Sequence, residues 1–262
     1  MQFTKKLIKK SLKLIGIERI NRALKRQGVK VELAPKGANY YFYYWRKAKK
    51  KIDLKALPEF WEIATTILND KKTMLYYDRL YTLWQGVLGI PSSDLPIAEI
   101  GTHRGGSAKF MMEALKTRGY NTNFYIFDTF EGHVVVDSKL DDRQHVGDFN
   151  NVSFEEVNSY LESPNVFIYK GDFLKTATHI ENIKNFSMVH IDVDVYPVTT
   201  FCLNFFKDRT LPGSVIIVDD YGNLSCKGLK KAVDDFILEN SNFKLFYLLT
   251  GQALIIKISN AH

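Results

Sequence analysis

Short apolar runs alternate with helix-length segments from Pro96 to the end of the chain. Five of these runs lie at residues 97–100, 124–127, 166–169, 188–191 and 215–218. Strands that alternate with helices in this way indicate repeated strand–helix–strand units, and therefore a parallel sheet.

The end of the chain departs from this alternation. Two more apolar runs, at 243–249 and 253–258, are separated by little more than Thr250-Gly251. So short a link makes the two strands antiparallel, because a parallel crossover needs about a dozen residues or more. We therefore predict an α/β, Rossmann-like domain over residues 96–262, whose seven-stranded, mostly parallel sheet ends in an antiparallel hairpin.

The first 95 residues have a different pattern. Residues 57–89 carry large apolar faces, which predict a helical lead-in over 56–95. Residues 1–55 form an N-terminal extension, in which apolar residues recur at helical spacing between Phe3 and Leu24 on a background of Lys and Arg. Six consecutive aromatic residues follow at 40–45.

The charge is divided in the same way. Residues 1–52 hold 16 Lys and Arg against 2 Glu, a net charge of +14, whereas the remainder sums to −7 and gives the total of +7. Basic amphipathic helices with aromatic residues are typical of membrane interfaces, so peripheral contact of 1–52 with the inner face of an anionic membrane is one expectation. The alternative is that this apolar stripe packs on the core or on a second subunit. No nucleic-acid-binding motif is present, and we expect no nucleic-acid partner.

No apolar stretch approaches the roughly 20 residues of a membrane span. The apolar run 14–17 is also too short for a signal peptide. Cys202 and Cys226 have no metal-binding spacing, which suits a reducing compartment. We therefore expect a cytoplasmic protein.

Candidate ligand-binding residues follow the first strand, because ligands of open α/β sheets bind at the carboxyl ends of the strands. The sequence there is Glu99-Ile100-Gly101-Thr102-His103-Arg104-Gly105-Gly106-Ser107, which matches neither a Walker A loop nor GxGxxG. A carboxylate at Glu99 would repel a pyrophosphate but suit a cationic methionine moiety. The residues of this stretch that we expect to contact a cofactor are Glu99, Gly101, Arg104, Gly105 and Ser107.

The next two strands end in further candidates. Asp128, at the end of the second strand, is placed to accept both hydroxyls of a ribose. Gly171 and Asp172 follow the third strand, where we expect the adenine edge.

Several carboxylates follow the fourth and fifth strands. Asp192 comes after the fourth, and Asp219 and Asp220 after the fifth, so all three are expected at one rim of the sheet. Crowded carboxylates repel one another unless a cation lies among them, and a hard divalent ion such as Mg²⁺ prefers oxygen ligands. Asp194 is as well explained as a helix cap, and His190 as a residue that hydrogen-bonds near the site.

Together these motifs resemble the macrocin O-methyltransferase family, class I enzymes that methylate sugar hydroxyls. The resemblance runs from about Thr73 to Phe236 and includes Asp128-Thr129-Phe130-Glu131-Gly132, His190 to Tyr196, and Asp219-Asp220-Tyr221-Gly222. It implies S-adenosylmethionine (AdoMet) as methyl donor and Mg²⁺ held by Asp192, Asp219 and Asp220. The family usually has Gly-Leu-Pro where Gly132-His133-Val134 stands here, so the acceptor cannot be copied from it.

The chemistry suggests a division of roles. A cation lowers the pKa of a sugar hydroxyl, and a carboxylate beside it, Asp192 in our interpretation, takes the proton. His133 and His145 lie in a polar segment where they are either acceptor-lid residues or solvent-exposed loop residues. The alternatives are a nicotinamide-dependent oxidoreductase and an inactive, membrane- or polyanion-binding relative.

Overall fold

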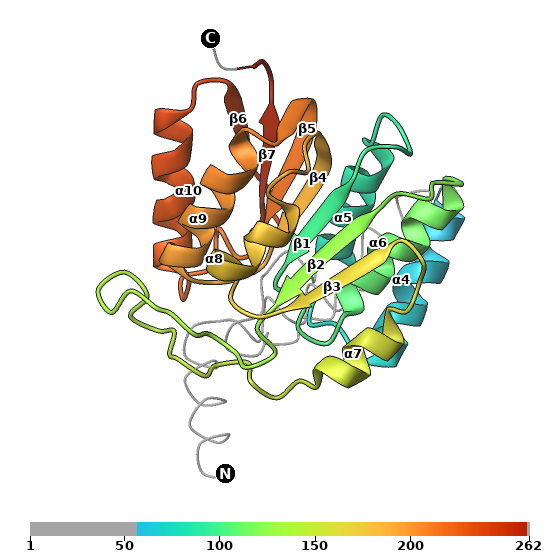
Figure 1. Cartoon of the computed structure of the whole chain (residues 1–262), viewed down its shortest axis with the longest axis horizontal. Helices are drawn as coiled ribbons and strands as arrows, with labels where there is room; N and C mark the ends of the chain where they lie inside the picture. Colours follow the sequence, from blue (N-terminus) through green and yellow to red (C-terminus); the bar gives the residue numbers. More distant parts are fainter. Residues whose placement is uncertain (1–56, 261–262) are drawn as a thin grey trace, which may run out of the picture. The chain divides into compact units, whose positions relative to one another are not determined.

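The computed structural model describes residues 57–260, and a seven-stranded sheet lies at their centre. The strands are β1 (Ile97–Ile100), β2 (Phe124–Asp128), β3 (Val166–Lys170), β4 (Phe186–Ile191), β5 (Thr210–Val218), β6 (Phe243–Tyr247) and β7 (Ala253–Lys257). Their order is β3-β2-β1-β4-β5-β7-β6, with parallel pairing from β3 to β5 and antiparallel pairing of β7 with both of its neighbours (Figure 1). The predicted sheet and its terminal hairpin are confirmed.

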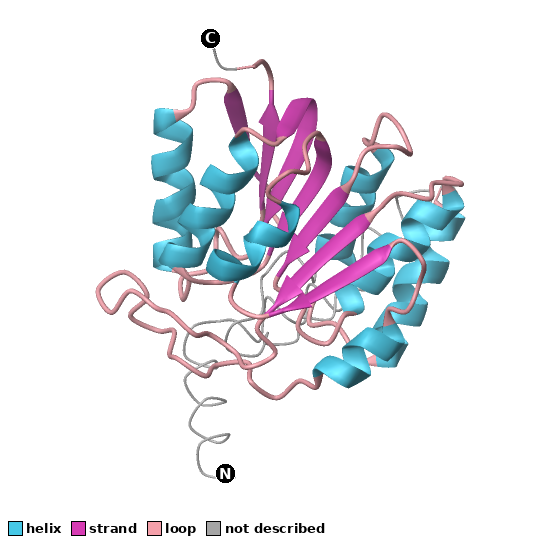
Figure 2. Ribbon diagram, viewed as in Figure 1, coloured by secondary structure: helices cyan, strands magenta, loops and turns pink. Residues whose placement is uncertain are grey.

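Helices cover both faces of the sheet (Figure 2). They are α4 (Pro58–Asp70), α5 (Tyr77–Leu88), α6 (Gly106–Thr117), α7 (Phe154–Tyr160), α8 (Phe173–Thr176), the 3₁₀ turn η2 (Ala177–Ile180), α9 (Tyr196–Lys207) and α10 (Lys227–Glu239). The predicted lead-in forms α4 and α5, which pack on α6. The predicted extension at 1–55 lies outside the described residues. No helix within 57–260 combines the length and the apolar character that a membrane span requires.

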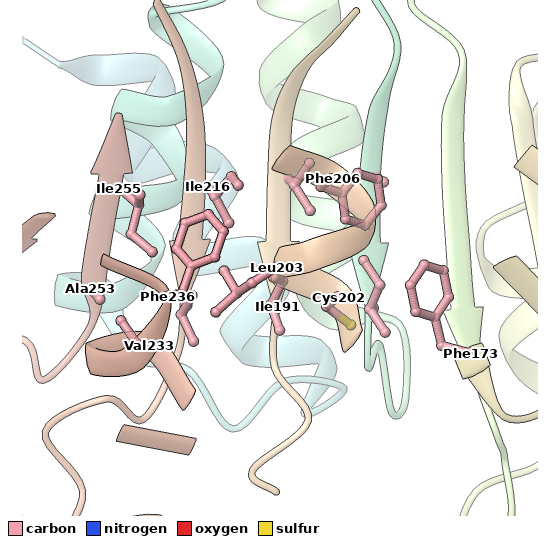
Figure 3. Packing of buried hydrophobic residues seen from close by; sticks show 14 of the residues in the cluster. Phe173, Ile191, Cys202, Leu203, Phe206, Ile216, Val233, Phe236, Ala253 and Ile255 are labelled. Atoms are coloured by element: carbon pink, nitrogen blue, oxygen red, sulfur yellow. The ribbon is translucent and has the colours of Figure 1, made fainter. Parts of the chain in front are cut away.

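The two faces of the sheet take alternate residues of each strand. Ile191 and Ile216 face α9 and α10, where they join a cluster of buried side chains that includes Leu203 and Phe236 (Figure 3). The alternate residues of the same two strands face α5. A Cβ atom on Gly86 of α5 would lie 2.8 Å from Met188 of β4 and 2.9 Å from Ile217 of β5. Since side chains alternate along a strand, the position after Val218 also points toward α5.

One strand boundary differs from the prediction. β5 begins at Thr210, five positions before the predicted 215, because Thr210 already pairs with Phe186 of β4. The register of β4 and β5 shifts between Phe186 and Met188. The early part of β5 contains Pro212 and Gly213, which are unfavourable in strands and hid this extension in the sequence.

Candidate active site

Three carboxylates meet at the carboxyl ends of β4 and β5. Asp192 follows β4, Asp219 and Asp220 follow β5, and one carboxylate oxygen of each lies within 4.8 Å of the others. Asp219 is fully buried, and its Oδ1 has no hydrogen-bond partner among residues 57–260. The structure thus brings together the three side chains that the sequence analysis assigned to a cation.

The site is electrostatically costly for carboxylates. Burial, and next the charge of Asp219, raise the pKa of Asp192 well above its ordinary value. Burial also raises the pKa of Asp219. Burial together with the charge of Asp220 raises the pKa of Asp194 to about 7. Several ionised carboxylates in so small a volume need a positive partner.

Arg79 of α5 supplies one such positive charge. Its Nη1 donates to Asp219 Oδ2 at 2.5 Å, and its Nη2 donates to Asp220 Oδ1 at 2.8 Å. The guanidinium therefore binds one oxygen of each residue. Asp219 Oδ1 and the second oxygen of Asp220 are left without this contact. A cation and Arg79 can thus use different oxygens of the same two carboxylates.

Sequence reasoning missed Arg79, although the sequence contained a signal. Arg79 precedes Gly86 by seven residues, which is close to two helical turns, so both lie on one face of α5. That face packs directly on β4 and β5.

Glu99 and His190 form a buried pair within the sheet. Its side chain in β1 is fully buried, and Oε1 is 2.8 Å from Nδ1 of His190, which is also fully buried. Glu99 is not among the residues that line the cavity at the carboxyl end of the sheet. The cause is strand geometry: Glu99 and His190 are register partners on neighbouring strands, so both side chains point to the same face. Oε2 of Glu99 has no hydrogen-bond partner among residues 57–260, and the contact of Glu99 with the methionine moiety stays a prediction.

Asp128 lines the cavity, but it also holds the loop that follows β1. Oδ2 accepts hydrogen bonds from the backbone amides of Thr102 at 2.9 Å and His103 at 2.7 Å, and Oδ1 accepts one from Phe130 at 2.8 Å. Burial raises the pKa of Asp128, and these three hydrogen bonds oppose that rise. Free lone pairs remain for a ligand hydroxyl, mainly on Oδ1, so the predicted ribose contact is compatible with this second role.

The glycines of the first loop permit close packing. A Cβ atom on Gly101 would lie 1.9 Å from the carbonyl oxygen of Asp192, so only glycine fits between the ends of β1 and β4. Gly105 has a φ of 81° and precedes α6, whose first turn contains the buried Ser107. Gly101 lines the cavity, whereas Arg104, Gly105 and Ser107 do not.

The lining of the cavity contains both acidic and apolar side chains. Gly171 and Asp172 line the cavity, and Asp172 also caps α8 by accepting from the amide of Leu174 at 3.0 Å. Four carboxylates line it from three places in the chain: Asp128 ends β2, Asp172 follows β3, and Asp192 and Asp194 follow β4. The apolar lining includes Phe127, Phe173 and Val198.

The segment between β2 and α7 covers part of this cavity. His133 lines the cavity, and its side chain is 11% exposed. Its Nε2 is 3.9 Å from Oδ2 of Asp194. Burial lowers the pKa of this imidazole. His145, in contrast, is 76% exposed and lies away from the cavity lining. Of the two lid candidates, only His133 faces the cavity.

A buried carboxylate fixes this segment in place. Asp141 is 2% exposed, and its two oxygens accept from the amide of Tyr196, at 3.0 and 3.1 Å, at the start of α9. A Cβ atom on Gly228 would collide with Asp141 Oδ1. Sequence reasoning missed Asp141, because in a polar segment nothing distinguishes a buried Asp from an exposed one.

A family comparison decides between the remaining interpretations. The model of the macrocin-O-methyltransferase (TylF) family matches residues 62–243, more than half of the chain. The chain belongs to this family. It is therefore an AdoMet-dependent O-methyltransferase, and the nicotinamide-dependent alternative is excluded.

Individual relatives agree with this assignment. The methyltransferase is 29% identical over 177 residues to the 8-demethyl-8-(2,3-dimethoxy-alpha-L-rhamnosyl)-tetracenomycin-C 4'-O-methyltransferase of Streptomyces olivaceus, covering 63% of this chain and 67% of the relative. Its fold resembles that of the O-methyltransferase NovP, with a TM-score of 0.57 and 22% identity over 71% of this chain and 82% of NovP. The methyltransferase PaMTH1 of Podospora anserina, solved with S-adenosylhomocysteine (SAH), has a TM-score of 0.53 and 14% identity over 87% and 99% of the two chains.

Proposed function

We propose that this methyltransferase transfers the methyl group of AdoMet to a sugar hydroxyl with the help of a divalent cation, Mg²⁺ in the first instance, at Asp192, Asp219 and Asp220. The observation that carries the proposal is the meeting of these three carboxylates beside the cavity of an O-methyltransferase.

The donor set fits a hard cation. The three residues offer only oxygen ligands, and the buried Oδ1 of Asp219 is without a hydrogen-bond partner in the described part of the chain. When bound, such a cation supplies a lower pKa for an acceptor hydroxyl and a fixed position for it. Arg79 keeps Asp219 and Asp220 in place through their other oxygens.

The cofactor seat is assigned to the cavity at the ends of β1, β2 and β3. Asp128 is positioned for the ribose, and Gly171 and Asp172 for the adenine edge. The acidic lining of the cavity favours a positively charged sulfonium, which AdoMet carries as its activated leaving group. Of the remaining predicted contacts, Ser107 lies in the first turn of α6, where free backbone amides favour a carboxylate.

Asp192 is our candidate for the proton acceptor. It lines the cavity and also belongs to the carboxylate group, so one residue adjoins both the proposed cofactor seat and the proposed cation. The covering segment anchored by Asp141 limits the access of water to this point.

The sugar class of the acceptor rests on the relative from Streptomyces olivaceus, whose name specifies a rhamnosyl substrate. The test is transfer of labelled methyl from AdoMet to a panel of glycosides, nucleotide sugars and glycan extracts. We expect label on a sugar hydroxyl, with loss of transfer in EDTA and recovery on addition of Mg²⁺. Undiminished transfer in EDTA would refute the cation, and absence of label from every sugar hydroxyl of the panel, with a protein that binds SAH, would refute the sugar class.

A further inference from the structure

A second depression adjoins the acidic cavity. It is formed by residues 71–74, between α4 and α5, by His103 and Arg104, and by residues 147–151 of the segment after β2. Met74, His103 and Phe149 line both the depression and the cavity. The two hollows are therefore neighbours that share part of their lining.

The two hollows have opposite charge. Four carboxylates and no Lys or Arg line the cavity. The depression is lined by Lys71, Lys72 and Arg104 against the single carboxylate of Asp148. Asp148 is already engaged, since its Oδ2 accepts from the amide of His145 at 2.8 Å. The depression therefore attracts an anion, whereas the cavity attracts a cation.

Close packing holds the basic residues beside one another. A Cβ atom on Gly106 would lie 2.6 Å from Thr73 Cβ and 2.7 Å from the backbone of Lys72, so the start of α6 is in direct contact with the segment that carries the two lysines. Arg104 is two residues before Gly106. Its neighbour His103 is fixed through its amide to Asp128 and through its ring to Asn151 at 3.2 Å.

Much of this positive charge is not neutralised within the described part of the chain. Neither Arg104 nor Lys71 makes a side-chain hydrogen bond or ion pair with any residue from 57 to 260. Lys72 is 3.7 Å from Glu156, a carboxylate that is 73% exposed, and such a surface pair is weak. Arg104 is half-buried, and its guanidinium is available to an anion in the depression.

We propose that this depression binds a phosphate or diphosphate group of the acceptor, so that the substrate is a sugar joined to phosphate rather than a neutral glycoside. A guanidinium and two ammonium groups from two chain segments suit the several oxygens and the multiple charge of a diphosphate better than a single carboxylate. The segment after β2 lines both hollows, so a group held in the depression lies beside the proposed cofactor seat. The inference rests on the proposed function, whose sugar hydroxyl lies at the other end of the same ligand.

Calorimetry on the full chain saturated with SAH tests the inference without any turnover. Pyrophosphate is titrated in metal-free buffer, so that it cannot bind through a cation, and sulfate at equal ionic strength measures non-specific attraction. We expect pyrophosphate to bind more tightly than sulfate. The variants Lys71→Gln/Lys72→Gln and Arg104→Gln should each weaken pyrophosphate about tenfold or more, because each removes charge-assisted hydrogen bonds. The matched control is Lys116→Gln/Arg118→Gln at the exposed end of α6, which should bind pyrophosphate as the wild type does.

Two organic diphosphates separate the possible sources of the group. Competition by uridine diphosphate supports a nucleotide-linked sugar, and competition by farnesyl diphosphate supports a lipid-linked one. The inference fails if pyrophosphate binds no better than sulfate, if the three positions do not matter, or if neither organic diphosphate competes. It also fails if Arg104→Gln lowers the affinity for SAH, because Arg104 then serves the carboxylate of the cofactor. None of these results depends on methyl transfer, so failure of the proposed function would be seen separately.

Discussion

Replacement of Arg79 by methionine tests the electrostatic account of the site. The change keeps an apolar stem on α5 but removes the guanidinium from Asp219 and Asp220. Asp219 is fully buried, and the side chain of Arg79 is 20% exposed, so little water can replace the lost contact. Removal of one partner from such a pair leaves an uncompensated buried charge, which costs about 3–5 kcal/mol. For a chain of this size we expect the melting temperature to fall by roughly 10 °C in metal-free buffer.

The pH dependence of this loss has a defined sign. Burial already raises the pKa of Asp219, and Arg79 opposes that rise, so the variant should raise this pKa further. A folded state with the higher pKa binds a proton that the unfolded state releases, so the penalty is largest at alkaline pH and shrinks as the pH falls. The stability difference between variant and wild type should therefore be smaller at about pH 5 than at about pH 8.

Urea denaturation at both pH values, with and without Mg²⁺, measures these differences. Mg²⁺ should stabilise Arg79→Met more than the wild type, since the cation then supplies the missing positive charge. Arg79→Lys, which keeps the charge but loses the two-point contact, should lie between them. The exposed Arg118→Met is the matched control and should change stability little. Equal stability of Arg79→Met and wild type in metal-free buffer at pH 8 would refute the role given to Arg79.

Three further outcomes are expected. Asp128→Ala should weaken SAH binding by roughly 1–3 kcal/mol and also destabilise the loop at Thr102 and His103; unchanged calorimetric affinity would remove Asp128 from the cofactor site. Asp141→Asn should loosen the covering segment, seen as faster amide exchange over 131–148, and unchanged protection would argue against this anchor. If residues 1–52 contact membranes, the full chain should co-sediment with anionic vesicles at low salt and a chain without them should not; equal recovery would exclude that contact.

The sheet could be predicted from the sequence because its signals are local. Each strand is a mostly apolar run with few polar interruptions, and the short link before Ala253 leaves antiparallel pairing as the only choice. The carboxylate group was predictable for the same reason: strand order places the ends of β4 and β5 side by side, and Asp192 and Asp219 directly follow those strands.

The missed features depend on contacts between distant segments. Arg79 and Asp219 are 140 residues apart, and only the packing of α5 on the sheet brings them together. The contact of Glu99 with His190 was not anticipated either, because it joins two strands whose register the sequence does not specify. Asp141 has no sequence signal at all, since its burial arises from the contact with the start of α9.

Binding of Mg²⁺ to the SAH-saturated protein is the most direct test of the central claim, that Asp192, Asp219 and Asp220 hold a divalent cation. Calorimetry would compare the wild type with Asp219→Asn, which keeps the size of the side chain and removes its charge. The account predicts saturable binding to the wild type, loss of that binding in Asp219→Asn, and the same affinity of both proteins for SAH. Absence of saturable Mg²⁺ binding to a wild-type protein that binds SAH, or its full retention in Asp219→Asn, would contradict the account.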